Sequence, residues 1–400
     1  MKTMWLNKNE IVQKLENRKL VFWGSGEWVA KTIKVLDMKP EYIIDNSPNI
    51  QGDIQRGIEV VSYDKIKDDI NSYFIVITTG AYLGLIEDLE KKGLGKEVNF
   101  CCSPSMYNLS IRDNLLSVQE ELLFTVTGSS KSDKGGLYTY NTSTRKYNRV
   151  FEGKSRAITS GKDKYVMVDE ERGLVIFDKK LKVLKEVKLL INAVPHGVAY
   201  SDKLRRIFVA NSGRDSVSVY DSESYEHLEE IKVSKKYDDL KEEQHHLNDL
   251  YIDENNMTLF VSMFSFVGNW RNNIYDGGIL EYDLEEKKFN NHPIVHDMWM
   301  PHSVQIVDNK LFFVDSMRGD LYETSNKVIG KFNGFIRGLA IGKQYIFIAQ
   351  SSHRYFDRLK NTSLNIPLDC GIYIFDNENK ASTFHSLYEF ENIHSIVLHK

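Results

Sequence analysis

Three histidines recur at the same place in three similar stretches of the sequence. His196 lies in PHGVAY, His302 in PHSVQI and His394 in NIHSIV. Neutral imidazoles are common ligands of Zn, Fe and Mn in sites that keep one position open for water or substrate. If these stretches converge on one axis, His196, His302 and His394 are predicted to bind a divalent metal.

Other polar residues start the equivalent stretches between these histidines. They are Arg156, Asn248 and Arg337, and His246 precedes Asn248 by two residues, the spacing that places side chains on one side of a strand. Arginine can clamp a carboxylate or phosphate with two hydrogen bonds. We therefore expect Arg156, Asn248, Arg337 and His246 to form a catalytic set. Two alternatives stay open: a metal-free pocket for an anionic ligand, and a structural channel without a ligand.

Two aspartates are further candidates for an acid or a base. Asp315 follows an apolar strand, and Asp249 directly follows Asn248. Strict alternation along a strand would turn Asp249 away from Asn248, where it could pair within the sheet.

The elements that position these residues are repeated. Segments with a shared plan of strand, turn and strand begin at Ser155, Pro195, Leu247, Pro301 and Ile336, and each continues into a strand such as GLVIFD or SVSVYD. Units of this kind, about 35 to 55 residues long, are typical of the four-stranded blades of a β-propeller.

The two ends of this repeated region complement each other. Residues 121–154 supply three strands without an innermost one, and residues 392–400 (NIHSIVLHK) match an innermost strand without a blade. Joining them would close a ring and remove an exposed sheet edge. The sequence thus predicts a six-bladed β-propeller closed by the C-terminal strand.

Two long loops are expected on the face where the inner strands begin. They span residues 262–278 and 350–370, and their candidate ligand contacts are Trp270, Arg271, Tyr275, His353, Arg354, Tyr355 and Arg358. Aromatic rings and cations suit a sugar or a nucleotide, although these residues could equally serve to pack the loops.

The first hundred residues have a different rhythm. The apolar run at residues 19–23 ends in Gly24, Ser25 and Gly26 and is followed by a helical pattern, and further strands and helices alternate up to residue 102. This alternation predicts a small Rossmann-like parallel sheet. Asp45 ends the second strand, where such folds bind a ribose hydroxyl, and the glycine turn could receive a phosphate. Alternatively, the glycines only make the turn and Asp45 caps a loop.

The run IIDNSPNIQGDIQRGIEVVSYDKI resembles the N-terminal domain of PglD-type bacterial sugar acyltransferases. The resemblance covers roughly residues 18–102 and implies that Gly24, Ser25, Gly26, Asp45 and Asn46 line a pocket for a nucleotide or nucleotide-sugar. Residues 120–400 resemble an uncharacterised bacterial propeller family in the blade starts His246–Asp249, Met300–Ser303 and Arg337–Ala340.

The expected fold class is therefore α/β plus all-β. A Rossmann-like domain at residues 1–102 precedes a linker at 103–119 and a propeller at 120–400. The net charge of -4 carries no basic excess, so we expect no nucleic acid partner. Neither a signal peptide nor a membrane-spanning run is evident, and the three cysteines form no disulfide framework, so the expected location is cytoplasmic.

The function expected from these features is that of a metal-dependent enzyme, of lyase, hydrolase or epimerase type. Its substrate would be small and polar, such as a sugar or nucleotide-sugar, and would bind at the propeller axis. The alternatives are a non-catalytic module that binds glycans or nucleotide-sugars, and a protein-interaction scaffold.

Overall fold

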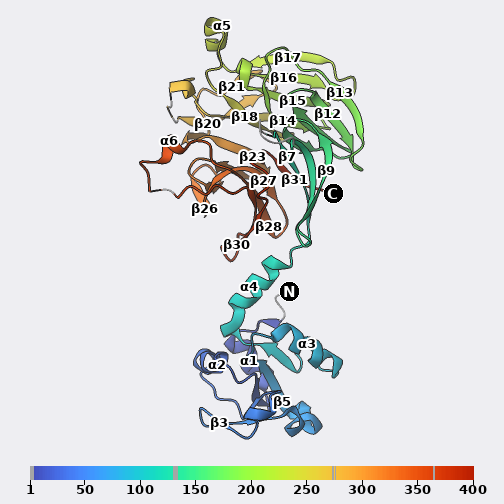
Figure 1. Ribbon diagram of the computed structural model, residues 1–400, viewed down its shortest axis with the longest axis vertical. Helices are drawn as coiled ribbons and strands as arrows, with labels where there is room; N and C mark the ends of the chain where they lie inside the picture. The colour runs from blue at the N-terminus through green and yellow to red at the C-terminus, as the bar shows by residue number, and fades with distance from the viewer. Residues whose placement is uncertain (1–3, 129–133, 273, 275, 364) are drawn as a thin grey trace. The chain divides into compact units, whose positions relative to one another are not determined.

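The computed structural model describes all residues except 1–3, 129–133, 273, 275 and 364. The chain divides into two compact units, Met1–Asn114 and Leu115–Lys400. Figure 1 colours the first unit blue to cyan and the second green to red. Among the described residues, none of the helices has both the length and the apolar character needed to cross a membrane.

The first unit is built on a six-stranded mixed sheet in the order β3-β4-β2-β1-β5-β6. Its strands are β1 (Lys19–Trp23), β2 (Tyr42–Ile44), β3 (Ile54–Gln55), β4 (Ile58–Val61), β5 (Tyr73–Ile77) and β6 (Phe100–Cys102). Its helices are α1 (Lys8–Leu15), α2 (Trp28–Leu36), α3 (Tyr82–Lys91) and α4 (Tyr107–Leu116), with short 3-10 turns at Pro48–Ile50, Tyr63–Lys65, Lys67–Ser72 and Pro104–Met106. All neighbouring strands run parallel except β3 and β4.

Apolar side chains cover both faces of this sheet. Cys101 joins the cluster on one face and Cys102 the cluster on the other. Burial raises the pKa of Cys102 to about 12, which keeps the thiol protonated and identifies it as a packing residue. The segment predicted as a linker is helical at α4, whose weak amphipathic pattern gave no helix signal in the sequence.

In the described part of the second unit, the strands form six antiparallel sheets of four or five strands, which confirms the prediction of a six-bladed β-propeller. The sheets are β7 (Glu121–Val126), β8 (Gly136–Asn141), β9 (Lys146–Glu152) with β31 (Ile396–Leu398); β10 (Ser155–Ser160), β11 (Lys164–Asp169), β12 (Gly173–Asp178), β13 (Val183–Val187); β14 (Pro195–Ser201), β15 (Arg206–Asn211), β16 (Ser216–Asp221), β17 (His227–Lys232); β18 (Leu247–Asp253), β19 (Thr258–Met263), β20 (Gly277–Asp283), β21 (Lys288–Phe289), β22 (Val295–Met298); β23 (Pro301–Val307), β24 (Lys310–Asp315), β25 (Asp320–Glu323), β26 (Lys327–Lys331); and β27 (Phe335–Ile341), β28 (Tyr345–Ser351), β29 (Gly371–Asp376), β30 (Ala381–Ser386). Short helices at Ser212–Arg214, Lys236–Leu240 (α5), Trp270–Asn272 and Phe356–Leu359 (α6) lie in the connections.

The last strand lies in the first sheet of the propeller. β31 pairs antiparallel with β7, so this sheet has the order β31-β7-β8-β9, and the two labels lie side by side in Figure 1. β31 also contacts the neighbouring inner strands β27 and β10. Ile393 and Ile396 are fully buried there, so the C-terminal segment contributes to the core.

The acidic strand ends of the repeats have a local cause. Asp178, Asp221, Asp283 and Asp376 each accept hydrogen bonds from two backbone N–H groups of the turn that follows. A short carboxylate at this position replaces the missing backbone partner and fixes the hairpin turn.

A bulge interrupts five inner strands near their N-terminal ends, one residue later in β23 than in the other four. Two residues of β10, β14, β18, β23 and β27 face one residue of the next strand, near their N-terminal ends. Such a bulge re-aims side chains without breaking the rest of the ladder. At Gly197 the bulge also brings β14 close to β18, because an added Cβ would lie 2.2 Å from the carbonyl oxygen of Asn248.

Four side-chain hydroxyls link a blade to the inner segment of the next blade. The pairs are Thr125 Oγ1 with the carbonyl of Arg156, Ser212 Oγ with Leu247, Ser303 Oγ with Arg337, and Ser351 Oγ with Ile393. These bonds give hydrogen-bond donors to backbone carbonyl groups beside the axis.

Candidate axial site

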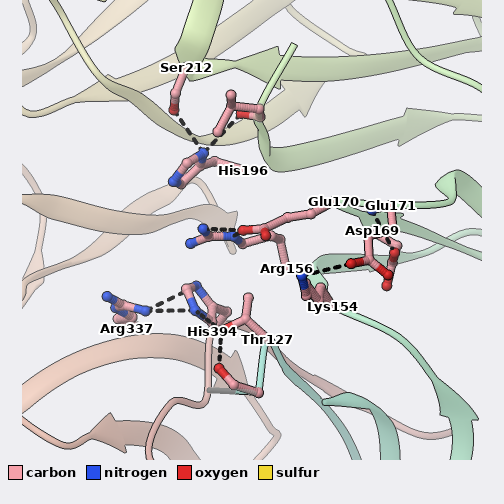
Figure 2. A network of polar contacts seen from close by, with 12 residues as sticks. Thr127, Lys154, Arg156, Asp169, Glu170, Glu171, His196, Ser212, Arg337 and His394 are labelled. Carbon is pink, nitrogen blue, oxygen red and sulfur yellow. Dashed lines mark hydrogen bonds and ion pairs between the residues drawn. The ribbon is translucent and has the colours of Figure 1, made fainter. Parts of the chain in front are cut away.

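Six side chains occupy the equivalent starts of the inner strands. In chain order around the axis they are Arg156, His196, Asn248, His302, Arg337 and His394, named here the axial ring. Figure 2 shows Arg156, His196, Arg337 and His394 directed toward a common space. The charges of Arg156 and Arg337 lower the pKa of both His196 and His394, in addition to the larger effect of burial, so these groups lie within electrostatic range of one another.

His196 and His302 have the same surroundings. His196 Nδ1 lies 3.1 Å from the carbonyl oxygen of Val194 and 2.8 Å from Ser212 Oγ. His302 Nδ1 lies 2.9 Å from the carbonyl oxygen of Met300 and 2.6 Å from Ser316 Oγ. A carbonyl only accepts, so Nδ1 carries the proton in both rings. Burial holds both pKa values well below 6.5, and the neutral rings therefore keep a lone pair on Nε2.

His394 differs from the other two histidines. Arg337 Nη1 lies 2.8 Å from its Nε2 and 3.0 Å from its Nδ1, and Thr127 Oγ1 lies 3.2 Å from Nε2. A guanidinium only donates, so Arg337 takes up the lone pair of His394. In the described part of the chain, no three His, Cys, Asp or Glu side chains form a group that could hold a metal ion. The predicted ligands His196, His302 and His394 therefore do not form such a group.

Arginines gather on one side of the ring. Arg156 pairs with Glu170, whereas neither Arg337 nor Arg354 forms an ion pair with a described carboxylate. Arg337 is only 4% exposed and lies over the ring of Phe335, at 4.8 Å. Burial, and then the charges of Arg354 and Arg156, hold its pKa well below that of a free guanidinium. The buried Arg337 thus lies within electrostatic range of Arg354 and Arg156, and also of the carboxylate of Asp249.

A cavity of about 760 Å³ opens on this side. Arg156 and Arg354 line it together with Glu170, Glu391 and Thr127. Its size suits a small ligand. A second cavity, of about 350 Å³, is lined by residues from each of the six inner strands and so lies on the axis itself.

The sequence-based expectation for Asp249 is wrong. Asp249 lines the second cavity and accepts a hydrogen bond from the backbone N–H of Ser303 on the next blade, at 2.8 Å. The bulge at Asn248 and Asp249 breaks the alternation on which the expectation rested. Burial raises the pKa of Asp249 to about 6. Asn248 is 3% exposed, and its Nδ2 has no partner among the described residues.

His246 lies beside the ring, but not by strand alternation. It precedes β18 in a left-handed conformation with φ 54°. Asp215 fixes this turn, because its carboxylate accepts the backbone N–H groups of residues 244, 245 and 246. The imidazole packs between Phe264 and Trp270 and against His196, with ring centroids 4.3, 4.5 and 4.8 Å away. Glu243 contacts its Nδ1.

Several other candidates have structural partners. Asp315 accepts the backbone N–H of Trp299 at 2.9 Å and pairs with Arg318 at 3.2 Å, and its pKa rises to about 6 because it is buried. The loop residues Trp270 and Tyr355 pack on an apolar cluster around Phe264 and Phe335. Tyr275 and the side chain of Arg358 lie outside the described residues.

In the first unit, the candidate residues meet at the glycine loop. Gly24 has φ 110°, and a Cβ there would lie 2.7 Å from that of Thr79, so the turn requires glycine. Asp45 Oδ2 accepts hydrogen bonds from the N–H and Oγ of Ser25, at 3.0 and 2.6 Å, and Oδ1 accepts from the N–H of Ser47. No hydrogen bond involves the side chain of Asn46, and an added Cβ at Gly26 would meet nothing within 4 Å, both counted over the described residues.

Sequence reasoning missed the residues that orient the imidazoles. Ser212 and Ser316 both follow the second strand of a blade, and Ser351 ends that strand in a third. This recurring serine was a detectable signal in ANSG, VDSM and AQSS. Glu243 and Asp215 had no comparable signal, because they lie in connections of unlike length.

Comparison with known proteins gives a family without an assigned activity. The model of a domain of unknown function, DUF4915, matches residues 195–397, which include every axial-ring position except Arg156. Nothing among curated proteins matches the chain. A chain of a nidogen/laminin complex has a TM-score of 0.50 at 10% identity, and the match covers 70% of this chain and 98% of that one. A protein of unknown function from Bacteroides caccae has a TM-score of 0.48 at 12% identity, with 70% and 99% covered. The family model covers more than half of the sequence, and the chain therefore belongs to the DUF4915 family.

Proposed function

We propose that the propeller axis binds a small anionic ligand through a carboxylate or phosphate group. The observation that carries this proposal is the group of Arg156, Arg337 and Arg354, in which only Arg156 has an ion-pair partner among the described residues. Guanidinium groups held close together repel one another and lose solvation when buried. An anion between them would offset both costs and could accept two parallel hydrogen bonds from each arginine.

The sequence-based expectation was a metal-dependent enzyme, and metal dependence stays a prediction. Arg337 donates to His394, so a divalent metal would have to use the lone pairs of His196 and His302. Elemental analysis of the purified protein tests this. Stoichiometric Zn, Fe or Mn that is lost in His302→Gln and kept in His394→Gln would support a metal on that side. Wild-type protein without metal would remove the expectation.

Titration calorimetry with inorganic phosphate and citrate tests the anion proposal. We expect binding by the full chain, a loss of at least about 100-fold in Arg337→Met, and steep weakening by salt. Arg318→Met is a matched control, because Arg318 also lies 4.8 Å over an aromatic ring, Trp299, but pairs with Asp315. Equal affinities in wild type and Arg337→Met would contradict the proposal.

For the first unit, we keep the proposal of a Rossmann-like domain with a nucleotide or nucleotide-sugar at the glycine loop. The parallel order of β4, β2, β1, β5 and β6 and the close turn at Gly24 support it. The Asp45 carboxylate accepts hydrogen bonds from Ser25 and Ser47, so a ribose hydroxyl would have to share it with these residues. A rise in melting temperature with UDP-N-acetylglucosamine that disappears in Asp45→Ala is expected, and no rise in wild type would contradict it.

A further inference from the structure

The side of the axis opposite the arginines offers hydrogen-bond acceptors. His196, Asn248 and His302 form three successive positions of the ring, and His246 packs on His196. The Nδ1 protons of His196 and His302 are held by backbone carbonyls, so both rings keep a lone pair on Nε2. No hydrogen bond from the described residues reaches these two Nε2 atoms. We name His196, His246, Asn248 and His302 the histidine side.

In His246, as in His196 and His302, an acceptor contacts Nδ1, and here the acceptor is Glu243. An ionised carboxylate only accepts, so its contact with Nδ1 places a proton on that nitrogen, and in the neutral ring Nε2 keeps the lone pair. Glu243 is itself fixed, since Arg271 lies 3.5 Å from its carboxylate and donates to its backbone carbonyl. The side chains of Glu243 and His246 are each 15% exposed. Glu243 and His246 thus form a half-buried pair whose orientation is fixed by neighbouring residues.

The arginine side carries donors instead. Besides Arg156, Arg337 and Arg354, His353 belongs to this side, because its ring packs against Phe335, over which Arg337 lies. Burial, and then the charge of Arg337, lowers the pKa of His353 to about 4. The backbone N–H of Tyr355 donates to His353 Nδ1 at 3.0 Å, so the neutral ring carries its proton on Nε2. That Nε2–H is buried and has no partner among the described residues. We name Arg156, Arg337, Arg354, His394 and His353 the arginine side.

We propose that the axial ligand is an anionic sugar derivative, such as a sugar phosphate or sugar acid, held across the axis. Its anionic group lies on the arginine side, and its hydroxyls donate to Nε2 of His196, His246 and His302. The Nδ2 group of Asn248 donates to a ligand oxygen. This inference rests on the anion proposal and adds the chemistry of the second half of the ligand.

Other classes of ligand would match the hydrogen-bonding groups on only one side of the axis. A second carboxylate or phosphate on the histidine side would face lone pairs and find the amide of Asn248 as a donor. An alkyl chain would leave these lone pairs and this amide without partners, which is costly in a buried site. A hydroxylated carbon chain supplies the missing donors, so it fits both sides.

Calorimetry with matched probes tests the inference. The hydroxylated probes are glucose 6-phosphate, ribose 5-phosphate and glucuronate, and the bare anions are n-hexyl phosphate and inorganic phosphate. We expect at least one hydroxylated probe to bind about tenfold or more tightly than the bare anions. His246→Phe, which keeps the aromatic packing on Phe264 and Trp270, should reduce this preference several-fold.

Substitutions of Glu243 separate orientation of the imidazole from simple packing. Glu243→Gln can still accept from His246 Nδ1 and should keep most of the sugar preference, whereas Glu243→Met should lose it as His246→Phe does. His385→Phe is the control, because His385 is a buried histidine that binds Tyr140 away from the ring. Unfolding curves establish that each variant is folded before binding is compared.

The outcomes distinguish the two proposals. If every hydroxylated probe binds no better than n-hexyl phosphate while Arg337→Met abolishes both, the sugar inference is wrong and the anion proposal stands. If Arg337→Met changes neither, the anion proposal itself fails. A sugar preference that survives His246→Phe and Glu243→Met would overturn the role assigned to this pair.

Discussion

The two sides of the axial ring share a backbone and differ in electrostatics. On both sides, residues at the starts of the inner strands turn toward the axis. Arg156, His196, Asn248 and Arg337 each lie at a bulge of their strand. On the histidine side, backbone carbonyls and serines hold neutral imidazoles. On the arginine side, guanidinium groups stand close together, and Glu170 is their one ion-pair partner among the residues that the structure describes. The fold therefore fixes where a side chain points, and residue type alone decides what each side can bind.

Removal of residues 392–400 should have the largest effect on stability, because it deletes β31, an inner strand on the arginine side of the ring. The deletion removes two fully buried isoleucines, leaves β7 as an open edge and deletes His394. We expect loss of cooperative unfolding or a fall in melting temperature of more than about 15 °C, several times the effect of a typical single substitution. His394→Gln should remain close to wild type. Circular dichroism and gel filtration measure both, and a deletion variant that stays monomeric and cooperative would argue against closure by this strand.

Substitutions of the two ring arginines should act in opposite directions on stability. Arg337 is buried and forms no ion pair with a carboxylate in the described part of the chain, so Arg337→Met should stabilise the protein by about 1 to 3 kcal/mol while anion binding is lost. Arg156→Met leaves Glu170 without its partner and should destabilise by about 1 kcal/mol. Urea unfolding at low salt measures both. A destabilised Arg337→Met variant would mean that Arg337 supports the fold.

The histidine side should make the protein sensitive to acid. Burial holds the pKa of His302 well below 6.5, so the unfolded chain binds a proton near that pH and the folded chain does not. Stability is therefore complete above about pH 6.5 and falls as the pH decreases below it. His302→Gln should reduce the slope of stability against pH by up to about 1.4 kcal/mol per unit between pH 6 and 5. His227→Gln, on the exposed outer strand β17, should leave the slope unchanged, and an equal slope in all three proteins would contradict the expectation.

A smaller effect of opposite sign is expected from Asp249. Its pKa is raised by burial from 3.8 to about 6, so between these pH values the folded state holds a proton that the unfolded state has released. Stability then decreases as the pH rises from about 4 to about 6. Asp249→Asn should be more stable than wild type at pH 7.5 but not at pH 4.5.

Asp253→Asn, on the same strand, is the contrasting variant for that comparison. Burial raises the pKa of Asp253, but hydrogen bonds from the side chain and backbone of Asn256 outweigh this and lower it below 3.8. This carboxylate therefore stabilises the fold above that pH, and its loss in Asp253→Asn should lower the melting temperature at pH 7.5. Melting temperatures across this range measure both, and the same pH dependence in the two variants would contradict the assignment.

The sequence was informative where structure repeats and uninformative where it does not. Equivalent blade starts such as those at His196 and His302 could be aligned, so the six-bladed fold followed from the pattern of strands and turns. The bulge at Asn248 and Asp249 leaves no mark on a pattern of period two, which is why Asp249 was placed on the wrong side. Glu243 and Asp215 act through one irregular connection, and their contact with the segment around His246 required the three-dimensional structure. Arg354 was named as a loop residue, but its proximity to Arg337 depends on the folding of a long loop.

The bulges should allow side chains at these ring positions to be exchanged with little change to the inner strands. Because Arg156, His196, Asn248 and Arg337 leave their strands where the ladder is already interrupted, their replacement disturbs few backbone bonds. Hydroxyl links such as Ser303 to Arg337 use the backbone carbonyl rather than the side chain. Recognition could thus be rewritten one blade at a time. Exchange of Asn248 for arginine, with Arg337 exchanged for asparagine, would rotate the charge pattern around the axis without a change of fold.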